Sequence, residues 1–476
     1  MRVRRDVPML LQSLHTDEYA PRPPSDEVVA AVHRSRELAG DAPEDDPDHW
    51  AGRLGTAAAL LAVNEQFGSR FYEVPAEAAV DREAAEEALG GDETVIDVQT
   101  HYLAERMGNT AQHLVPIYRE AMPDWWKGLD DLASYNFAEY LRCVFIEAET
   151  AVAVLTSAPG RGSHRQLFND EIAATRRLLD ELGPRGRLLN HAIVHPNFDD
   201  ELESMEGWAA EYRPVGWKVY TMGEPDLTPG VYEGRWGPDP SWADKLSGVW
   251  KEGWTLDDPI GRRFLDRVRE LGRVGGPMTV CAHKGLSGLA ETASPSDLGP
   301  ASVDYPDIDF VAYHSGYEMH GDPEGPYSEA VAHLGTNRMV KSLLDSGVAP
   351  GSNVYAELGT TWFLVAARPH EAAHVLGKLL VAVGEDNVVW GTDGIYYGPG
   401  QQLIDAFRAF QIPVEMQEEF GYPALTSAIK EKILSTNAAK VYGIDLEQAR
   451  RNAENDDLAW IREAADHYRR SGTPQW

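Results

Sequence analysis

The chain has 476 residues, of which 43% are hydrophobic and 13 are tryptophan, so it can bury a large core. Its formal net charge of −33 argues against nucleic acid or an anionic membrane as the main partner, because an acidic surface repels both and no basic patch interrupts it. Two cysteines exclude a disulfide scaffold, and no apolar run reaches the roughly 20 residues that span a bilayer.

We expect no signal peptide in the first residues. A basic start is followed by the apolar residues 7–12, a run too short and too soon interrupted for a signal-peptide core. We therefore expect a cytoplasmic protein whose partner is a small-molecule substrate.

Residues 1–92 carry few strand signals and are rich in Pro, Asp, Glu and Ala. Helical patterns occur at residues 25–38 and 50–67, and a loop is expected at 41–48. This pattern predicts a helical N-terminal extension that packs on a main domain.

From Val95 onward, short β-rich runs alternate with helix-like stretches, which indicates βα units and a parallel sheet. Eight strands close a barrel, so the fold class expected for residues 93–446 is α/β, a (β/α)8 TIM barrel. A last amphipathic helix is expected in residues 447–476, after a closing helix that ends at Gly443. The strands are expected at residues 94–99, 151–155, 189–194, 217–220, 278–281, 308–312, 354–357 and 388–390.

Two connections, residues 102–138 and 221–258, are far longer than the usual 2–6 residues of such loops. Both follow strands, so these long βα-loop insertions should lie over the active-site face as lids or pocket walls. The alternative is that their tryptophans merely pack the insertions on the barrel. These tryptophans are Trp125, Trp126, Trp236, Trp242, Trp250 and Trp254.

Four expected strands end close to a histidine or an aspartate, namely His101, His283, His314 and Asp393. Catalytic residues of barrel enzymes lie at these C-terminal strand ends, so the four side chains form a candidate site. Each also has a plain alternative: a histidine can be held in the core, and an aspartate after a strand can cap the next helix.

The motifs Asp97-Val-Gln-Thr-His101, Ala-His283-Lys-Gly, Tyr-His314-Ser-Gly and Gly-Thr-Asp393, with the terminal Asn437-Ala-Ala-Lys-Val-Tyr-Gly, resemble the amidohydrolase superfamily. The similarity covers roughly residues 95–443. Its nearest branch is the amidohydrolase-related group, which includes aminocarboxymuconate-semialdehyde decarboxylase, resorcylate decarboxylases and lactone hydrolases.

This resemblance implies one divalent metal ion, zinc first and manganese or iron otherwise, and no organic cofactor. By position in the motifs, His101, His283 and Asp393 would be its ligands. Gln99 stands where the family has the first histidine of the pair, and its carboxamide oxygen is a weak, neutral ligand. Some decarboxylases of the branch have glutamate there, and some lactone hydrolases work without metal.

The resemblance further implies that His314 moves protons at the reacting centre, with Asp393 as the other catalytic residue. Asp97 shares a strand face with Gln99 and is expected to orient a ligand. Substrate contacts are expected from Lys218, Lys284, Glu357, Arg106, Tyr317 and Trp362, and the aromatic residues Tyr396 and Tyr397 would add to the pocket wall. Ion pairing or core packing is the alternative for each.

Three functions compete. The first is a metal-dependent hydrolase that cleaves an amide-like or lactone-like C–N or C–O bond in a small organic acid. The second is a non-oxidative, metal-dependent decarboxylase, for which the same ligands serve. The third is a barrel that has lost catalysis and binds a ligand or a partner, a hypothesis supported by Gln99 alone. By analogy with the family, the chain is expected to form a homo-oligomer.

Overall fold

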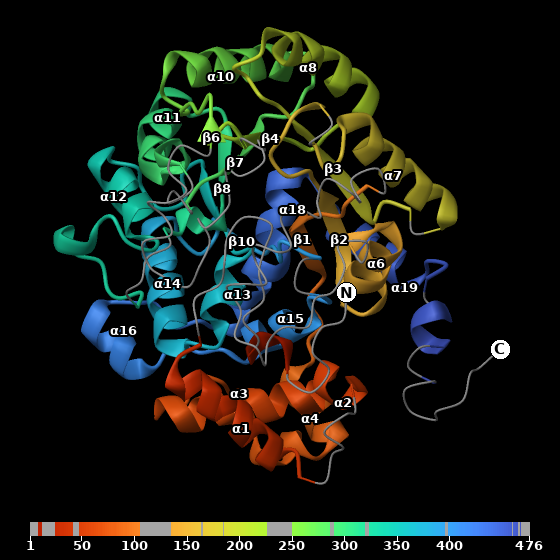
Figure 1. Ribbon diagram of the computed structural model, residues 1–476, viewed down its shortest axis with the longest axis vertical. Coiled ribbons are helices and arrows are strands. Elements are labelled where there is room, and N and C mark those ends of the chain that lie inside the picture. The colour runs from red at the N-terminus through yellow and green to blue at the C-terminus, as the bar shows by residue number, and fades with distance from the viewer. Residues whose placement is uncertain are drawn as a thin grey trace, which may run out of the picture.

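A parallel β-barrel lies at the centre of the molecule, and helices surround it (Figure 1). The computed structural model describes residues 8–11, 24–40, 47–104, 135–162, 165–183, 185–225, 250–285, 290–318, 323–395, 398–458, 460–464 and 467. Within these residues the eight-stranded sheet has the order β1-β2-β3-β4-β7-β8-β9-β10. The predicted (β/α)8 fold class is therefore confirmed.

Each expected strand forms within two residues of its predicted bounds. Neighbouring strands pair in parallel, as the alternation of strand and helix patterns requires. The strands are β1 (Val95–Thr100), β2 (Thr150–Leu155), β3 (Leu188–Ile193), β4 (Gly216–Tyr220), β7 (Thr279–His283), β8 (Asp309–Tyr313), β9 (Val354–Glu357) and β10 (Val388–Val389).

Backbone hydrogen bonds join the last strand to the first although β10 is short. The Val98 amide donates to the Trp390 carbonyl at 3.1 Å, and the Asp393 amide donates to the Gln99 carbonyl at 3.0 Å. The His101 amide then donates to the Gly394 carbonyl at 2.5 Å. This seam brings the end of β10 directly beside the end of β1.

The helices around the barrel bury apolar side chains against it. In α10 (Pro259–Gly272), Asp258 caps the first turn, Pro259 occupies it, and the side chains of Phe264, Leu265, Val268 and Leu271 are buried. In α14 (Pro369–Ala382) and α15 (Gln401–Ala409) nearly every residue is buried. The helix α18 (Asn437–Tyr442) packs on the smaller core of the barrel. The other described helices that follow β2 are α7 (Asn169–Leu182), α8 (Asp199–Tyr212), α11 (Leu298–Asp304), α12 (Asn337–Asp345), α13 (Thr361–Ala366), α16 (Val414–Phe420), α17 (Ser427–Glu431) and α19 (Leu446–Glu454).

The end of α18 agrees with the predicted helix stop. Gly443 follows Tyr442 with a φ of 64°, a left-handed conformation that glycine adopts without steric cost.

Two short helical segments, α6 (Phe137–Leu141) and a π-helical turn at Arg142–Ile146, precede β2.

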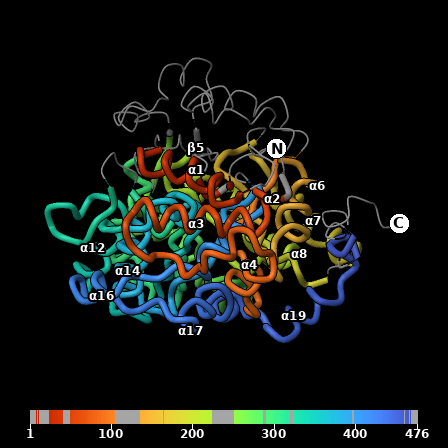
Figure 2. Tube along the Cα trace, turned by 90° about the horizontal axis from the view of Figure 1, so that it is seen from below, coloured from red at the N-terminus to blue at the C-terminus, as the bar shows by residue number. Residues whose placement is uncertain are grey.

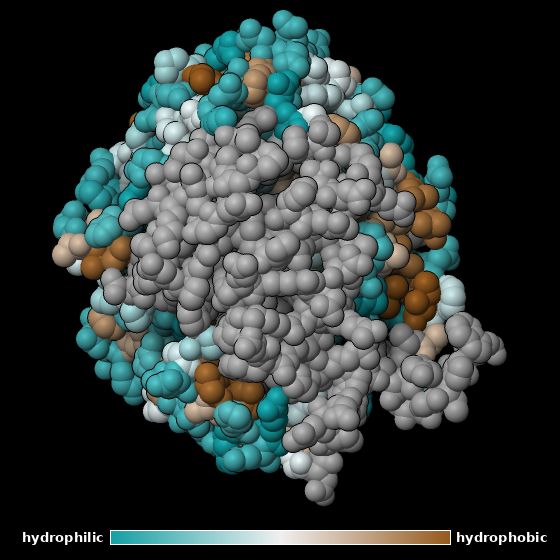
Figure 3. Space-filling model, in the orientation of Figure 1, coloured by the Kyte–Doolittle hydropathy of each residue, from teal (hydrophilic) through white to brown (hydrophobic). Residues whose placement is uncertain are grey.

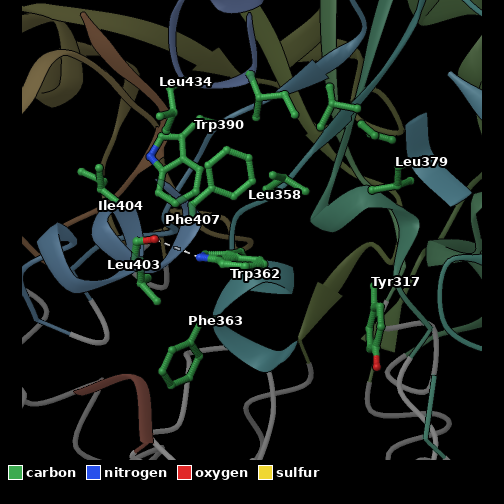
Figure 4. Packing of buried hydrophobic residues seen from close by; sticks show 14 of the residues in the cluster. Tyr317, Leu358, Trp362, Phe363, Leu379, Trp390, Leu403, Ile404, Phe407 and Leu434 are labelled. Atoms are coloured by element: carbon green, nitrogen blue, oxygen red, sulfur yellow. Dashed lines mark hydrogen bonds between the residues drawn. The ribbon is translucent and has the colours of Figure 1, made fainter. Parts of the chain in front are cut away.

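Between the sheet and the helices lies a large apolar core. Figure 4 shows part of it, where Trp362 of α13 lies near Trp390 and Phe407, and its indole nitrogen donates to the Leu403 carbonyl at 3.0 Å. The rings of Trp362 and Phe407 meet edge to face with centroids 5.3 Å apart. A second, smaller core fills the barrel interior around Val98, Val311 and Tyr313.

Within the described residues, four α-helices precede β1 and lie together on one side of the molecule, in red and orange in Figures 1 and 2. Main-chain bonds fasten the segment after them to the barrel shell: the Glu73 amide donates to the Ala409 carbonyl at 2.8 Å, and the Gln411 amide donates to the Phe71 carbonyl at 2.6 Å. The helices are α1 (Asp26–Leu38), α2 (Pro47–Ala51), α3 (Arg53–Phe67) and α4 (Arg82–Leu89).

Most of the two predicted insertions lies outside the described residues, including Trp125, Trp126, Trp236 and Trp242. In the second insertion, β5 (Glu224–Pro225) pairs antiparallel with β6 (Trp250–Lys251). Trp254 is buried and meets the Phe264 ring of α10 edge to face. This tryptophan packs the connection on the barrel and does not line an open pocket.

The described part of the surface is mainly hydrophilic on the face shown in Figure 3, with small separate apolar patches near its margin. Within the described residues, no helix has both the length and the apolar character that crossing a membrane demands.

Candidate active site

The C-terminal ends of the strands carry a buried cluster of polar side chains, which we call the mouth cluster. It consists of Gln99, His101, His283, His314, Glu357 and Asp393, and each residue is at most 1% exposed. The strands β1, β7, β8, β9 and β10 deliver these residues from distant parts of the chain. The structure thus brings together the four strand-end residues with Gln99 and Glu357, which the sequence analysis had assigned to the metal site and to substrate contact.

Donors from three residues surround Asp393. Its Oδ1 accepts a hydrogen bond from the Gln99 amide nitrogen at 2.8 Å and lies 3.1 Å from His101 Nε2. Its Oδ2 accepts a hydrogen bond from the Thr360 hydroxyl at 2.5 Å. Both carboxylate oxygens are therefore held by protein groups.

His314 is held by β9 and the residues that follow it. Its Nδ1 lies 3.0 Å from the Gly359 carbonyl oxygen, which can only accept, so Nδ1 carries a proton. In the neutral ring, Nε2 must then hold the lone pair, and Nε2 is the atom that can exchange a proton. The Thr361 hydroxyl also donates to the His314 carbonyl at 2.7 Å and fixes this backbone.

His283 lies against His314. The two imidazole rings meet edge to face with centroids 4.7 Å apart, and the Tyr220 ring lies 5.2 Å from His283 on centroids. The histidines of β7 and β8 therefore form one pair, and His101 with Asp393 forms another.

Two more carboxyl groups are buried here, Glu357 of the mouth cluster and Asp97 beside it. Asp97 accepts bonds from the Thr392 amide at 3.0 Å and the Thr392 hydroxyl at 2.6 Å, so it positions the residue before Asp393. Glu357 accepts the backbone amides of His314 and Gly359 at 3.0 and 2.5 Å. Burial raises the pKa of both Asp97 and Glu357 to about 7, against the opposing effect of these hydrogen bonds.

Left-handed backbone is concentrated at this site. His314, Ser315, Thr360 and Asp393 have φ between 51° and 59°, a region that residues with a Cβ rarely adopt. Such strain persists only where the surroundings impose it, and it is typical of functional sites.

Beneath the mouth cluster, a second polar group fills the barrel interior. The Lys218 ammonium lies 3.4 Å from the centroid of the Tyr313 ring, in a cation–π contact. The Tyr313 hydroxyl donates to the Val98 carbonyl at 2.8 Å. On His191, Nδ1 lies 3.3 Å from the Tyr313 hydroxyl, and Nε2 lies 3.4 Å from Cys281 Sγ. Lys218 is thus packed among aromatic rings below the mouth.

The sequence analysis did not select His191, although its position on an expected inward strand face was a signal for it. Burial lowers its pKa well below the usual value and raises the pKa of the Cys281 thiol to about 11. Both groups are therefore neutral at pH 7, and Cys281 is not an activated nucleophile. The same holds for the buried Cys143, whose pKa burial raises to about 12.

Several residues expected to contact substrate have structural partners. Lys284 donates to Asp297 at 2.6 Å and to the hydroxyl of Thr221 at 3.0 Å, in a fully buried ion pair. Trp362 belongs to the apolar core described above, and Tyr317 is buried against that core as well. Arg106, Tyr396 and Tyr397 lie outside the described residues.

The donor types expected for a metal ion are present, but their arrangement does not fit one. Among the described residues, no three His, Cys, Asp or Glu side chains are placed so that together they could hold an ion. Gln99 turns an N–H donor toward Asp393, and His101 Nε2 faces the same carboxylate. The metal site with His101, His283, Asp393 and Gln99 as ligands therefore stays a prediction.

Similar solved structures share little sequence with the chain. An uncharacterized TIM-barrel protein from Bordetella bronchiseptica is 13% identical, with 75% of this chain and 99% of that chain covered and a TM-score of 0.44. A 2,6-dihydroxybenzoate decarboxylase from Rhizobium is 14% identical, with 74% and 99% covered and a TM-score of 0.40. A dihydroxybenzoic acid decarboxylase from Polaromonas, with bound manganese and an inhibitor, is 14% identical, with 74% and 97% covered and a TM-score of 0.43.

These structural similarities are too low to say anything about function, and no curated protein matches the chain. The family comparison is more informative, because the family described as Amidohydrolase matches residues 96–444. That range begins in β1 and runs through β10 to the residue after Gly443, so it includes the whole barrel and every residue of the mouth cluster. The chain belongs to the amidohydrolase family.

Proposed function

We propose that the chain is a decarboxylase-type lyase that releases carbon dioxide from a small organic acid at the barrel mouth. The observation that supports it is the state of Asp393, whose two oxygens are both bound by protein donors. A hydrolase needs a base that takes a proton from water. Both oxygens of Asp393 already accept hydrogen bonds from protein groups. Decarboxylation needs no activated water.

The reaction suits an acid whose carboxyl-bearing carbon is next to a hydroxyl or keto oxygen. The bond between that carbon and the carboxylate breaks, its electron pair stays on the carbon, and carbon dioxide leaves. A proton from Nε2 of protonated His314 then replaces the carboxyl group. The contact of Nδ1 with the Gly359 carbonyl keeps the ring oriented during this transfer.

The surroundings contribute in two ways. Burial of the mouth cluster excludes water, which strengthens electrostatic interactions at the reacting centre. His101 Nε2 lies 3.1 Å from Asp393 Oδ1, so the two side chains hold each other in position beside the reacting centre. None of these steps requires the predicted metal ion.

The test is a panel of hydroxy and keto acids, assayed for carbon dioxide and for hydrolysis products. The wild type is expected to release one carbon dioxide for each substrate consumed. His314→Asn should lower kcat by about 100-fold or more, as loss of a general acid does. His333→Asn, the same change at an exposed histidine, is the control.

Hydrolysis products without carbon dioxide would replace this proposal with the hydrolase that the sequence analysis placed first. Absence of turnover in every assay, together with a cellular function that both His314→Asn and Asp393→Asn retain, would instead support a barrel that binds without catalysing.

A further inference from the structure

His195 follows β3 directly and lies at the same end of the barrel as the mouth cluster. The Val194 amide still donates to the Lys218 carbonyl at 2.9 Å, so strand geometry continues to this point. His191 faces the barrel interior, and strand alternation places His195 on the same face. In the order of the barrel, two strands separate β3 from β8 on one side and two separate it from β10 on the other. His195 therefore lies across the mouth from His314 and Asp393.

A buried arginine fixes the proton on the His195 ring. Arg165 lies 2.8 Å from His195 Nδ1, and a guanidinium group can only donate. Nδ1 also lies 3.3 Å from Glu201 Oε2, a longer contact, so we assign Nδ1 as the acceptor of the shorter Arg165 bond and place the N–H on Nε2. Glu201 holds both partners in place, since its Oε1 accepts from Arg165 at 2.6 Å and its Oε2 accepts from the His195 amide at 2.9 Å.

This N–H has no acceptor among the described residues, although the His195 side chain is only 1% exposed. A buried donor left without a partner is destabilising, because nothing compensates for the hydrogen bond it loses to water. Thr156, which follows the neighbouring strand β2, is also a buried polar residue. It lies on the same strand face as Val152 and Val154 of the barrel interior, and its hydroxyl has no hydrogen-bond partner among the described residues. Two adjacent strands thus end in polar groups that no described residue satisfies.

We propose that His195 and Thr156 bind a second carboxylate of the substrate, remote from the carboxyl group that leaves, so that the substrate is a small dicarboxylic acid. Arg165 polarises the imidazole through Nδ1, which makes Nε2–H a stronger hydrogen-bond donor. Such a donor forms its strongest hydrogen bond with a charged acceptor, and a carboxylate oxygen is one. The Thr156 hydroxyl adds a second donor. The identity of the leaving group rests on the proposed function, whereas the binding itself does not.

The first experiment measures binding to the full-length protein by titration calorimetry, with isophthalate as a rigid dicarboxylate and benzoate as the matched monoacid. Wild type is expected to bind isophthalate at least tenfold more tightly than benzoate. His195→Asn and Thr156→Val should each reduce this preference to threefold or less. Equal affinity of wild type for the two probes, or no binding of either, would overturn the proposal.

A matched pair of variants separates binding from a structural role. Glutamine can place an amide N–H close to the position of Nε2, and asparagine is too short to do so. If His195 contacts the ligand, His195→Gln retains a preference of at least fivefold and His195→Asn does not. If His195 only holds Arg165 and Glu201, the two variants lose thermal stability and isophthalate affinity equally, which contradicts the proposal.

The binding assay also distinguishes this inference from the proposed function. The protein could prefer isophthalate, lose this preference in His195→Asn and release carbon dioxide from no acid. That result would refute the proposed lyase and support the dicarboxylate site. Carbon dioxide release from monoacids with the same KM in wild type and His195→Asn removes the dicarboxylate site and leaves the lyase.

Discussion

The amide nitrogen of Gln99 donates a 2.8 Å hydrogen bond to Oδ1 of Asp393, across the seam where the barrel closes. The family resemblance places a metal-binding histidine at the position of Gln99. Here an N–H group faces the aspartate instead, and it offsets part of the carboxylate charge that an ion would otherwise neutralise.

Gln99→His should therefore increase metal binding, because it restores an imidazole ligand beside His101. We expect wild type purified without chelator to hold well below one equivalent of zinc, manganese or iron, and Gln99→His to hold at least three times as much by plasma mass spectrometry. Gln411→His, which adds the same imidazole far from the mouth, controls for non-specific binding. One full equivalent in wild type would show that Gln99 is a sufficient ligand.

Glu357→Gln should weaken both stability and catalysis. Each oxygen of Glu357 accepts a backbone N–H, from Gly359 and from His314, and glutamine keeps only one acceptor. The amide group would face the other N–H, so we expect the free energy of unfolding to fall by about 1–3 kcal/mol in urea titrations. Carbon dioxide release should slow as well, since His314 shifts. The exposed Glu77→Gln is the control, and equal stability of the two variants would refute this account.

Lys284 stabilises the fold and should not set substrate affinity. Removing one partner of a buried ion pair leaves the other charge uncompensated, so Lys284→Met should lower the free energy of unfolding by about 3–5 kcal/mol. Adding Asp297→Asn removes that stranded charge and keeps an acceptor for the Leu256 amide. The double variant should therefore be more stable than Lys284→Met. If Lys284→Met had the stability of the wild type and a raised KM, Lys284 would be a substrate-binding residue after all.

Stability should rise with pH between about 8 and 10.5 because of Lys430. Burial lowers its pKa from 10.5 to about 8 in the folded chain, where its ammonium donates to the Arg408 carbonyl at 2.5 Å. In this window the unfolded chain binds more protons than the folded one, so the free energy of unfolding increases with pH, by at most about 3 kcal/mol. Lys430→Met should flatten the rise in denaturant titrations at pH 7.5, 9 and 10.5. An identical slope in wild type and variant would show that another group causes it.

The strands could be predicted from the sequence because their signal is local. Each is a short β-rich run, and even β10, with two residues in the ladder, was marked by the apolar Val388-Val389-Trp390 before Asp393. The strand ends also identified His101, His283, His314 and Asp393, which the structure gathers in one buried cluster.

Pairings among these side chains could not be predicted, since they depend on three-dimensional distances. Lys284 follows a strand as His283 does, yet its partner Asp297 comes from a loop 13 residues later. His195 was passed over because it matches no family ligand, and only the buried contact with Arg165 shows which of its nitrogens carries the proton. Trp362 next to the mouth was indistinguishable in sequence from a core residue, which it is.

The left-handed backbone at the mouth of the barrel makes the fold less stable than it could be. The residues concerned are His314, Ser315, Thr360 and Asp393, so a gain in thermal stability there conflicts with catalysis. Each such residue costs about 1–2 kcal/mol relative to ordinary geometry, and glycine would relieve that cost. Glycine would also delete the imidazole, hydroxyls and carboxylate that these positions present. Selection for thermal stability should therefore favour glycine at these four positions. Selection for catalytic turnover should favour the residues that are there now.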